Sequence, residues 1–492
     1  MLLRELLMDL DIIDIRGCID LGVESIAYDS RKVSKNSLFI CIRGFKTDGH
    51  LYIRDAIING AIAIITEEDT NINHVTVIRV KNTRRAMAVL ANKFFDYPSE
   101  KLQLVGITGT NGKTSTSYMV KNILEKANNK VGVIGTIANW IGEKRIETKL
   151  TTPEAIDFQA LLYKMLNKQI KYCIMEVSSH SLELNRVDGS NFRIGLLTNL
   201  SSDHMDFHNT VEEYRNSKKK LFSKTSYKNI INIDDKHGKI IFKEIKDYKT
   251  SLLTYGIDNR ADIMAKDITL NLKGVSFQLY SPDYRGRIEI SIPGIFTVYN
   301  ALAAIAISHA LGIEFKSIQE GLRDMAGIAG RMDLINEFKE FAVIVDYAHT
   351  PDALENLLKS TRKFAANKLI TVFGCGGDRD KNKRAVMGEI AGENSDLTII
   401  TSDNPRTENP LEILAMIEEG IKKTPGRYFI VEDRRQAISL ALRRAQKGDI
   451  VLIAGKGHET YQTIGNKNFE FDDKKVALET GREAGLLCLH KI

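Results

Sequence analysis

The sequence predicts an α/β protein of three domains. With 492 residues, the chain is too long to fold around a single hydrophobic core. Apolar runs of strand length alternate with segments of helical periodicity, and a glycine-rich turn joins one such strand to a helix. We therefore expect a smaller N-terminal α/β domain (1–98), a central P-loop ATPase-type parallel sheet with a side antiparallel sheet (99–333), and a C-terminal Rossmann-like doubly wound sheet (334–492).

The composition is that of an ordinary soluble globular protein, with 43% hydrophobic and 27% charged residues. The net charge of +6 is spread along the chain, so it indicates small anionic substrates rather than a nucleic-acid partner. The five cysteines lack metal-type spacing and are typical of reduced thiols in a cytoplasmic protein. Charged residues interrupt the first 14 positions and no apolar run is long enough to span a bilayer, so we expect no signal peptide and no membrane insertion.

The N-terminal domain is predicted from short strands and helices that alternate. Strands are expected at residues 37–42, 61–66 and 74–80, and helices at residues 52–59 and 82–97. An Asn82 cap opens the second helix, and Pro98 closes the unit. Two polar clusters, at residues 29–31 and 46–50, would be ordinary turns if judged alone.

Residues 106–116 form the glycine-rich turn, between a predicted strand (102–107) and a predicted helix (114–126). Bare backbone N–H groups and the positive end of a helix together make a cradle for phosphate. Lys113 would reach the outer phosphates, and the Thr114 hydroxyl would help to hold Mg²⁺. The standard spacing is not met, because its first glycine falls on Ile107. The alternative is a Gly/Thr-rich turn before a surface helix.

Two further strands of the central domain end in polar residues. The strand at residues 172–175 runs into Glu176, where an acidic residue beside a P-loop usually holds Mg²⁺. The strand at residues 196–200 runs into residues 202–208, whose two histidines and two aspartates are either metal ligands or a polar loop. Beyond them we expect antiparallel strands and an apolar core helix, at residues 263–281, 287–292 and 298–311.

The C-terminal domain is predicted from five apolar strands, at residues 342–345, 369–373, 397–401, 428–431 and 450–454. Residues 374–380 imitate a dinucleotide-binding turn, but Arg379 occupies the place of the third glycine, which argues against a nicotinamide enzyme. The strand ends carry Arg379, residues 403–406 and residues 455–459. Guanidinium groups beside acids suit a zwitterion, because arginine binds carboxylate and acids bind ammonium. The alternative is a set of surface ion pairs.

Residues 108–114, taken with Glu176, residues 203–204 and residues 346–351, resemble the Mur ligases of peptidoglycan synthesis. The resemblance covers essentially the whole chain. The clusters at residues 29–31 and 48–50 resemble members that act on UDP-N-acetylmuramoyl-L-alanyl-D-glutamate. The P-loop alone is also similar to that of folylpolyglutamate synthases. Residues 403–406 resemble the motif of members that add meso-2,6-diaminopimelate rather than L-lysine, an assignment that depends above all on Arg406.

The resemblance implies roles for particular residues. The implied ATP site comprises Gly109, Thr110, Asn111, Gly112, Lys113, Thr114, Ser115, Asn300, Arg331 and Asp346. The implied UDP-N-acetylmuramoyl-dipeptide site comprises Ser30, Thr151, Thr152, Ser178 and Arg186. The implied diaminopimelate site comprises Arg379, Asp403, Asn404, Pro405, Arg406, Gly455 and Glu459. The implied metal ligands are Thr114, Glu176, His204 and Lys218 as a carbamate, and the implied catalytic residues are Lys113, Lys218, Arg331 and His349. The chain departs from the family at Thr297 and Ala329.

Lys218 has two interpretations. From the residues alone, Lys218, Lys219 and Lys220 favour a solvated basic helix face. The resemblance implies instead that CO₂ forms a carbamate on Lys218, whose negative charge would hold a second Mg²⁺.

The expected activity is ATP-dependent amide ligation. A substrate carboxylate would attack the γ-phosphoryl group of ATP, giving ADP and an acyl phosphate, which an incoming amine would then convert to an amide and phosphate. The alternatives are the same ligation with L-lysine, a folylpolyglutamate-type ligase, a regulatory GTPase and a binding protein without catalysis. A GTPase would need a guanine-reading Asn-Lys-x-Asp, which the sequence lacks. We expect a monomer.

Overall fold

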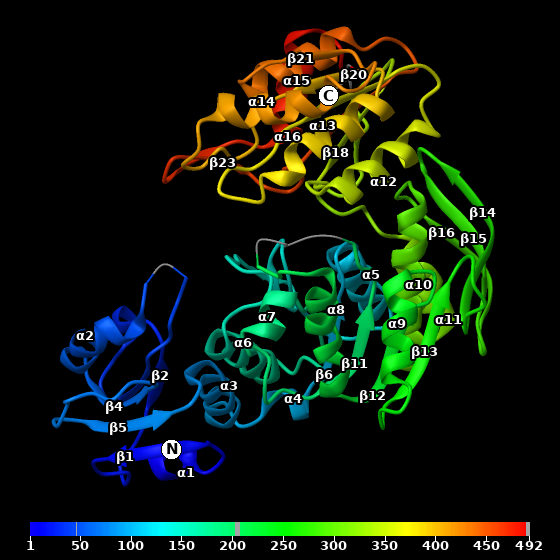
Figure 1. The fold of residues 1–492 in the computed structure, drawn as a ribbon. Coiled ribbons are helices and arrows are strands. Elements are labelled where there is room, and N and C mark those ends of the chain that lie inside the picture. Colours follow the sequence, from blue (N-terminus) through cyan, green and yellow to red (C-terminus); the bar gives the residue numbers. More distant parts are fainter. Residues whose placement is uncertain (46, 202–206, 489–492) are drawn as a thin grey trace.

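The computed structural model describes residues 1–45, 47–201 and 207–488, and it contains three large sheets. In Figure 1 the unit around the third sheet (yellow to red) lies over the unit around the central sheet (cyan to green), and the N-terminal unit (blue) lies to one side. The polypeptide passes once through each unit, so each sheet is built from one continuous stretch of sequence.

The first sheet has the order β1-β5-β4-β3-β2, with β1 antiparallel to β5 and the other neighbours parallel. Its strands are β1 (Ile12–Arg16), β2 (Ser25–Ala27), β3 (Ser37–Ile40), β4 (Ala61–Thr66) and β5 (Thr76–Val80). The helical segments of this unit are α1 (Leu3–Leu7), η1 (Ser30–Lys32), η2 (Gly49–Tyr52), α2 (Ile53–Ile58), α3 (Thr83–Phe94) and α4 (Pro98–Lys101). The Asn82 side chain accepts a hydrogen bond from Arg85 N, which confirms the predicted cap of α3.

The central sheet has eleven strands in the order β16-β15-β14-β13-β12-β11-β6-β10-β7-β8-β9. They are β6 (Gln103–Thr108), β7 (Val131–Ile134), β8 (Asn139–Ile141), β9 (Lys144–Ile146), β10 (Tyr172–Glu176), β11 (Phe192–Leu197), β12 (Thr225–Asn232), β13 (Ser251–Gly256), β14 (Ile263–Asn271), β15 (Gly274–Tyr280) and β16 (Arg285–Ile290). The helices of this unit are α5 (Lys113–Lys126), α6 (Ala155–Asn167), α7 (Ser179–Glu183), α8 (Val211–Lys219), η3 (Lys220–Lys224), α9 (Lys236–Ile245), α10 (Ile295–Ala310) and α11 (Phe315–Arg323).

The predicted side sheet is present as the antiparallel strands β14, β15 and β16. These strands continue the parallel part of the central sheet, because Tyr255 and Gly256 of β13 pair with Ile263 and Met264 of β14. The predicted strand at residues 196–200 is shifted toward the N-terminus, to β11. Residues 198–200 leave the ladder because Asn199 bonds to the glycine-rich turn instead.

The third sheet has the order β17-β18-β22-β19-β20-β21, parallel except for the pair β17–β18. Its strands are β17 (Asp333–Ile335), β18 (Ala342–Asp346), β19 (Leu369–Phe373), β20 (Leu397–Ile400), β21 (Tyr428–Ile430) and β22 (Ile450–Ala454). The helices are α12 (Pro351–Arg362), α13 (Asn382–Asn394), α14 (Pro410–Ile421), α15 (Arg434–Arg444) and α16 (Asp473–Glu483), and a hairpin is formed by β23 (Tyr461–Ile464) and β24 (Lys467–Glu470). This is the doubly wound sheet that the five apolar runs predict.

One buried cluster extends from the central sheet into the third unit, whereas the first sheet has a separate core. The apolar helix α10 lies within the larger cluster, with Ala303, Ile305 and Ile307 fully buried. The core of the first unit includes Ala155 and Ile156 of α6, so the first unit packs against the central one through that helix. The central and third units therefore share one hydrophobic core.

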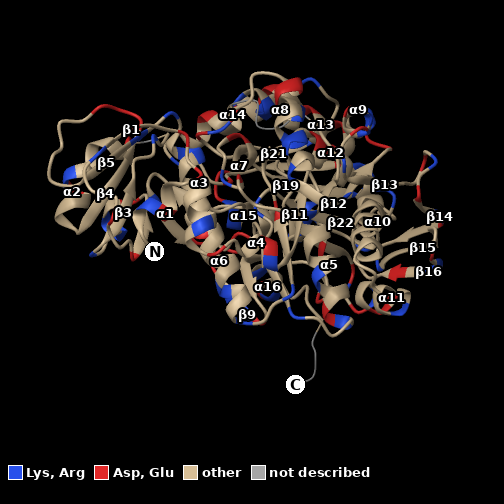
Figure 2. Ribbon diagram, turned by 90° about the horizontal axis from the view of Figure 1, so that it is seen from below, with Lys and Arg blue, Asp and Glu red and all other residues tan. Residues whose placement is uncertain are grey.

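Acidic and basic residues are interspersed over the helices of all three units (Figure 2). Among the described residues, no helix has both the length and the apolar character that crossing a bilayer would need.

Candidate active site between the central and third sheets

The turn between β6 and α5 requires glycine at two positions. Gly109 has φ +143°, and a Cβ atom there would lie 1.9 Å from Thr198 Oγ1. Gly112 has φ +85°, and a Cβ atom there would lie 2.3 Å from Asn300 Oδ1. Asn199 supports the turn by accepting a hydrogen bond from Asn111 N on Oδ1. The turn thus has the backbone shape of a phosphate cradle, with the N-terminus of the 14-residue helix α5 directly behind it.

Two lysine side chains meet at this turn. Lys113 Nζ donates hydrogen bonds to the carbonyl oxygens of Gly109 and Thr110, each at 2.8 Å. Lys218 Nζ donates to the same Gly109 oxygen, also at 2.8 Å, and lies 4.4 Å from the centre of the Tyr214 ring. Lys218 is only 1% exposed, so the interpretation as a solvated helix face is wrong for this residue. That interpretation applies to Lys220, which is exposed and pairs with Glu183.

The Glu176 carboxylate lies beneath the turn and is 1% exposed. Its Oε2 atom accepts hydrogen bonds from Thr114 Oγ1 at 2.9 Å and Thr136 Oγ1 at 3.0 Å, and its Oε1 atom accepts one from Thr136 N at 2.9 Å. These are hard oxygen donors at the carboxyl end of a strand, which is a chemically suitable set for Mg²⁺. His204, the other predicted metal ligand of this region, lies outside the described residues.

The predicted dipeptide-binding residues of the central unit lie together next to Glu176. Thr152 Oγ1 donates to the Glu176 carbonyl oxygen and accepts from Ser178 N. Arg186 Nη1 donates to the Thr152 carbonyl oxygen at 3.1 Å. Thr151 Oγ1 lies 3.1 Å from Thr136 Oγ1 and thereby joins this group to the oxygen atoms around Glu176.

Ser30 lies apart from these residues, in the N-terminal unit. It is buried in η1, and its carbonyl oxygen accepts a hydrogen bond from Asn59 Nδ2. Contacts across the boundary are made by its neighbours: Tyr28 OH donates to Asp157 Oδ2, and Arg84 lies 3.5 Å from Glu154, which also pairs with Arg186. Burial and the adjacent Asp157 raise the pKa of Tyr28, so this phenol stays protonated.

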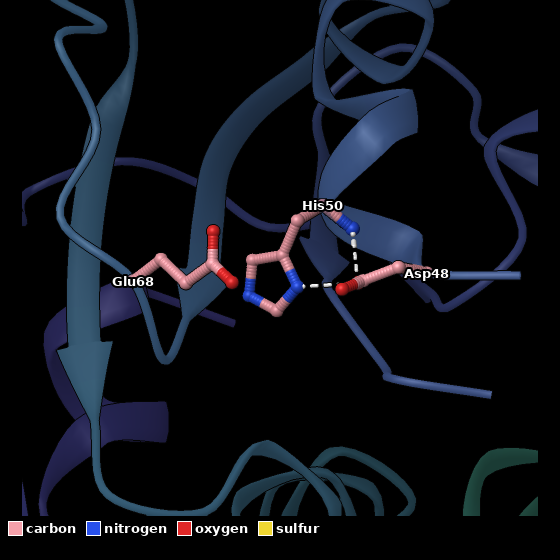
Figure 3. A group of neighbouring side chains, drawn as sticks. All are labelled: Asp48, His50 and Glu68. Carbon is pink, nitrogen blue, oxygen red and sulfur yellow. Dashed lines mark hydrogen bonds and ion pairs between the residues drawn. The ribbon is translucent and has the colours of Figure 1, made fainter.

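The second polar cluster of the N-terminal unit is shown in Figure 3. Asp48 Oδ1 is 2.6 Å from His50 Nδ1, and a ligand atom of Glu68 lies within 4.8 Å of both residues. Arg43 pairs with both carboxylates, and His50 Nε2 accepts a hydrogen bond from Glu67 N. These hydrogen bonds and ion pairs within the cluster stabilise the loop before η2, which explains why the residues lie together.

Three contacts connect the turn to the third unit. Asn111 Nδ2 donates to Asp352 Oδ2 at 3.0 Å, at the first turn of α12. Arg331, in the linker before β17, approaches Thr114 Oγ1 through Nη2 at 3.5 Å. The Arg331 guanidinium also lies 4.6 Å from the centre of the Tyr347 ring. The ATP-side residues of the central unit and the strand ends of the third unit therefore face one another.

Asp346, at the end of β18, holds the linker in place. Its carboxylate accepts hydrogen bonds from Met332 N and Ala348 N, each at 2.8 Å. Burial raises the pKa of Asp346, and the Arg331 charge opposes that rise. His349 lies three residues after Asp346, and its Nδ1 bonds to the Tyr347 carbonyl oxygen at 2.8 Å.

A cluster of charged side chains, most of them buried, lies beyond β20 and β22. Lys456 is fully buried, and its Nζ donates to Asn404 Oδ1 at 3.1 Å and to Glu459 Oε2 at 3.3 Å. Asn404 Nδ2 donates to the same Glu459 oxygen at 2.8 Å. Burial raises the pKa of Glu459, and the nearby Asp403 carboxylate adds to the rise. Gly455 is required here, because a Cβ atom at its φ of +114° would lie 2.7 Å from Asp403 Oδ2.

The guanidinium of Arg406 belongs to the same charged cluster. The backbone of Arg406 is in the left-handed region, with φ +52°. Its N–H donates to Thr463 O and its carbonyl oxygen accepts from Gly465 N, so the β23–β24 hairpin holds it in place. Burial lowers the pKa of Arg406, and the Arg379 charge lowers it further. Arg379 itself is exposed and bonds to the neighbouring Asp378 carbonyl oxygen.

The sequence analysis did not identify the residues that form the ion pairs of this charged cluster. Lys456 lies inside residues 455–459, so the polar strand end already pointed to it. The buried pair of Arg384 and Glu408 gives no such signal, because α13 and the loop before α14 bring it together. Both oxygens of Glu408 accept hydrogen bonds from Arg384 at 2.9 Å, which holds the pKa of Glu408 near 2.

A P-loop that faces a cluster of acidic and guanidinium side chains across a junction between two units is an arrangement that suits a ligase, which activates a carboxylate with ATP and then supplies an amine. Known proteins agree with this class. Residues 22–95 match the "Mur ligase family, catalytic domain", residues 107–308 the "Mur ligase middle domain", and residues 330–457 the "Mur ligase, glutamate ligase domain". The chain belongs to the Mur ligase family.

Relatives with one name resemble the chain over nearly its whole length. The UDP-N-acetylmuramoyl-L-alanyl-D-glutamate–2,6-diaminopimelate ligase of Alkaliphilus metalliredigens (strain QYMF) is 54% identical over 487 residues, covering 99% of both chains. Its namesake in Clostridioides difficile (strain 630) is 53% identical and covers 97% of this chain and 99% of its own. A solved structure with the same name superposes with a TM-score of 0.70 at 32% identity, covering 99% of both chains.

Proposed function

We propose that the protein is an ATP-dependent ligase that adds meso-2,6-diaminopimelate to UDP-N-acetylmuramoyl-L-alanyl-D-glutamate, a cytoplasmic step of peptidoglycan synthesis. The observation that carries the proposal is the hydrogen bond from Asn111 of the P-loop to Asp352 of α12, which joins the P-loop to the unit that holds Arg406 and Glu459. The shared name of relatives at 53–54% identity supports this choice of substrates.

In the first step, the substrate carboxylate attacks the γ-phosphoryl group of ATP, forming a C–O–P bond and releasing ADP. A carboxylate is otherwise a poor electrophile, because its leaving group would be oxide. The proposed ATP site comprises residues 109–115 with Asn300, Arg331 and Asp346. Lys113 and Arg331 would stabilise the charge on the transferring phosphoryl group. Thr114 and Glu176 would hold Mg²⁺, which supplies further positive charge to the phosphates.

In the second step, the neutral amine of diaminopimelate attacks the acyl phosphate, and the tetrahedral intermediate expels phosphate. Arg406 would bind a carboxylate of the amino acid with its planar fork, and Asp403 and Glu459 would bind its distal ammonium. Thr151, Thr152, Ser178 and Arg186 would hold the dipeptide of the other substrate, with its uridine near Ser30. Closure of the third unit on the central one would exclude water from the acyl phosphate.

We also propose that Lys218 is carbamylated and holds a second Mg²⁺. Its burial beside Lys113 supports this, because a lysine without water near a second cation favours the neutral amine that reacts with CO₂. Lys218→Ala should then lose activity, whereas Lys220→Ala should keep it. Equal activity of Lys218→Ala and the parent would rule out an essential carbamate.

We further propose that the chain acts as a monomer, with domain boundaries at residues 98/99 and 333/334. The boundaries are supported by the three sheets, because each sheet draws its strands from one of these stretches, except that β17 of the third sheet begins one residue earlier, at Asp333.

The test of the proposed function is phosphate release from ATP by the full chain. The nucleotide-dipeptide is supplied with meso-diaminopimelate or with L-lysine, and folate with glutamate serves as the second comparison. We expect release only with the nucleotide-dipeptide and diaminopimelate together. Release with lysine alone would change the amino acid, and release only with folate would replace the proposal by the folylpolyglutamate-type alternative.

A further inference from the structure

His458 lies at the point where the third unit meets the linker from the central unit, and no step above uses it. Three segments converge there: residues 330–331 of the linker, Tyr347 after β18, and residues 457–458 after β22. A Cβ atom at Gly330 would lie 2.1 Å from His458 N, and one at Gly457 would lie 2.6 Å from Tyr347 Cβ. Because these backbones are in contact, the His458 imidazole has a defined place beside Arg331 and Tyr347.

The Tyr347 ring lies close to both polar side chains. Its centre is 4.6 Å from the Arg331 guanidinium carbon and 5.0 Å from the centre of the His458 ring. Both side chains contain a buried nitrogen that has no hydrogen-bond partner among the described residues: Arg331 Nε and His458 Nδ1. Buried nitrogens of this kind are usually satisfied by a ligand or by ordered water.

The surroundings of the imidazole indicate what such a ligand is. Burial lowers the pKa of His458 to about 4, and the charged or titratable groups Arg331, Arg145 of β9 and His349 add to this lowering. The imidazole is therefore neutral near pH 7, so that one ring nitrogen donates and the other accepts. Arg331 near a neutral N–H donor forms a positive environment that favours an anion.

We propose that Arg331 Nε and His458 Nδ1–H together bind the phosphoryl group that is transferred from ATP to the substrate carboxylate. The inference rests on the proposed function, in which the P-loop binds ATP. Arg331 is close to that site, because its guanidinium approaches the Thr114 hydroxyl of the P-loop. His458 would hold the acyl phosphate on the side that faces Glu459, its neighbour in the chain. No covalent bond to His458 is involved, and the imidazole donates a hydrogen bond without losing its proton.

Three substitutions separate this role from simple packing. In His458→Asn, an amide group occupies the place of Nδ1, whereas in His458→Gln it occupies the place of Nε2, and His458→Phe keeps only the ring. We expect His458→Phe and His458→Gln to lose about 10- to 100-fold in kcat with unchanged KM for diaminopimelate. His458→Asn should stay within about 3-fold of the parent. Equal losses in all three variants, or none, would overturn the proposal.

A second measurement uses binding rather than turnover, so it does not depend on the amino-acid substrate. The full chain with Mg²⁺ is titrated with ADP alone and with ADP plus orthovanadate, which imitates the transferring phosphoryl group. Vanadate should tighten ADP binding to the parent and to His458→Asn, and about 10-fold less to His458→Phe, with equal affinity for ADP alone. Equal vanadate effects in the parent and His458→Phe would contradict the proposed contact.

The imidazole itself reports the contact. The chain contains ten histidines, so in protein with ¹³C-labelled histidine rings the His458 signal is the one missing from His458→Asn. Its pKa should rise by at least one unit when ADP and vanadate are added, because an anion stabilises the charged imidazole. An unchanged pKa would overturn the proposal. If the parent protein did not catalyse the ligation but vanadate still tightened its binding of ADP, only the proposed function would be refuted.

Discussion

The glycine-rich turn after β6 and the charged cluster beyond β20 and β22 both lie at the carboxyl ends of parallel strands. They differ in the chemical groups that form them, which are backbone groups in the turn and charged side chains in the cluster. The turn is made of backbone: Gly109 and Gly112 fit where no side chain could, and Asn199 accepts its hydrogen bond. The charged cluster is made of ion pairs in which a fully buried cation meets a partly buried acid, Lys456 with Glu459 and Arg384 with Glu408.

This difference indicates which substitutions should reduce catalysis without reducing the stability of the fold. A backbone cradle keeps its shape when one of its side chains is shortened, since its donors are peptide N–H groups. A buried charge that loses its partner is left without water or counter-charge, which is strongly destabilising. Substitutions at the turn should therefore reduce catalysis alone, and substitutions in the charged cluster should reduce both catalysis and stability.

The largest expected effect is that of Lys113→Ala. Removing the ammonium that neutralises the transferring phosphoryl group should lower ATP consumption by about 1,000-fold or more. The melting temperature should hardly change, because the contacts of Lys113 with Gly109 and Thr110 are hydrogen bonds to its own turn. Phosphate release and calorimetry measure the two quantities, and the exposed Lys130→Ala is the control. A large loss of stability would contradict the comparison.

Lys456→Met should show the opposite behaviour. The substitution leaves Glu459 and Asn404 without their buried partner and should cost about 3–5 kcal/mol of stability. For a domain of this size the melting temperature should fall by roughly 6–20 °C. The exposed Lys447→Met should be neutral. Adding Glu459→Gln to Lys456→Met should recover part of the stability, and a further loss in the double variant would refute the pairing.

Arg406→Ala should weaken the use of diaminopimelate by about 2–5 kcal/mol in kcat/KM, if Arg406 holds a carboxylate of the amino acid in this half-buried site. Steady-state kinetics with varied diaminopimelate measure the change, and Arg443→Ala on the exposed face of α15 is the control. Unchanged kinetics would remove the amino-acid assignment and leave the ligase proposal intact.

The smallest expected effect concerns pH. The pKa of Glu408 is lowered from 4.5 to about 2 by Arg384, so this carboxylate stabilises the fold above pH 4.5 and loses that contribution as pH falls toward 2. Glu408→Gln should cost about 1 kcal/mol at pH 7, because Glu408 is partly exposed and solvent screens the pair, and progressively less below pH 4.5. Melting temperatures between pH 7 and pH 3 test this, with Glu412→Gln as the control. A difference that stays constant with pH would contradict the ion pair.

What the sequence determined by itself is local. The turn at residues 106–116, its strand and its helix are contiguous, so glycines, apolar periodicity and a cap residue such as Asn82 predicted them within a few positions. The strands at residues 369–373 and 450–454 are likewise found as predicted, because a buried parallel strand is a continuous apolar run.

Only the tertiary structure decided which charges meet. Lys218 lies in a run of three lysines that reads as solvated, yet the packing of α8 against the turn buries it. Arg384 and Glu408 are 24 residues apart, and Arg331 precedes β17 whereas His458 follows β22. Burial and pairing depend on distances between segments that no local pattern encodes, whereas a turn depends only on the residues within it.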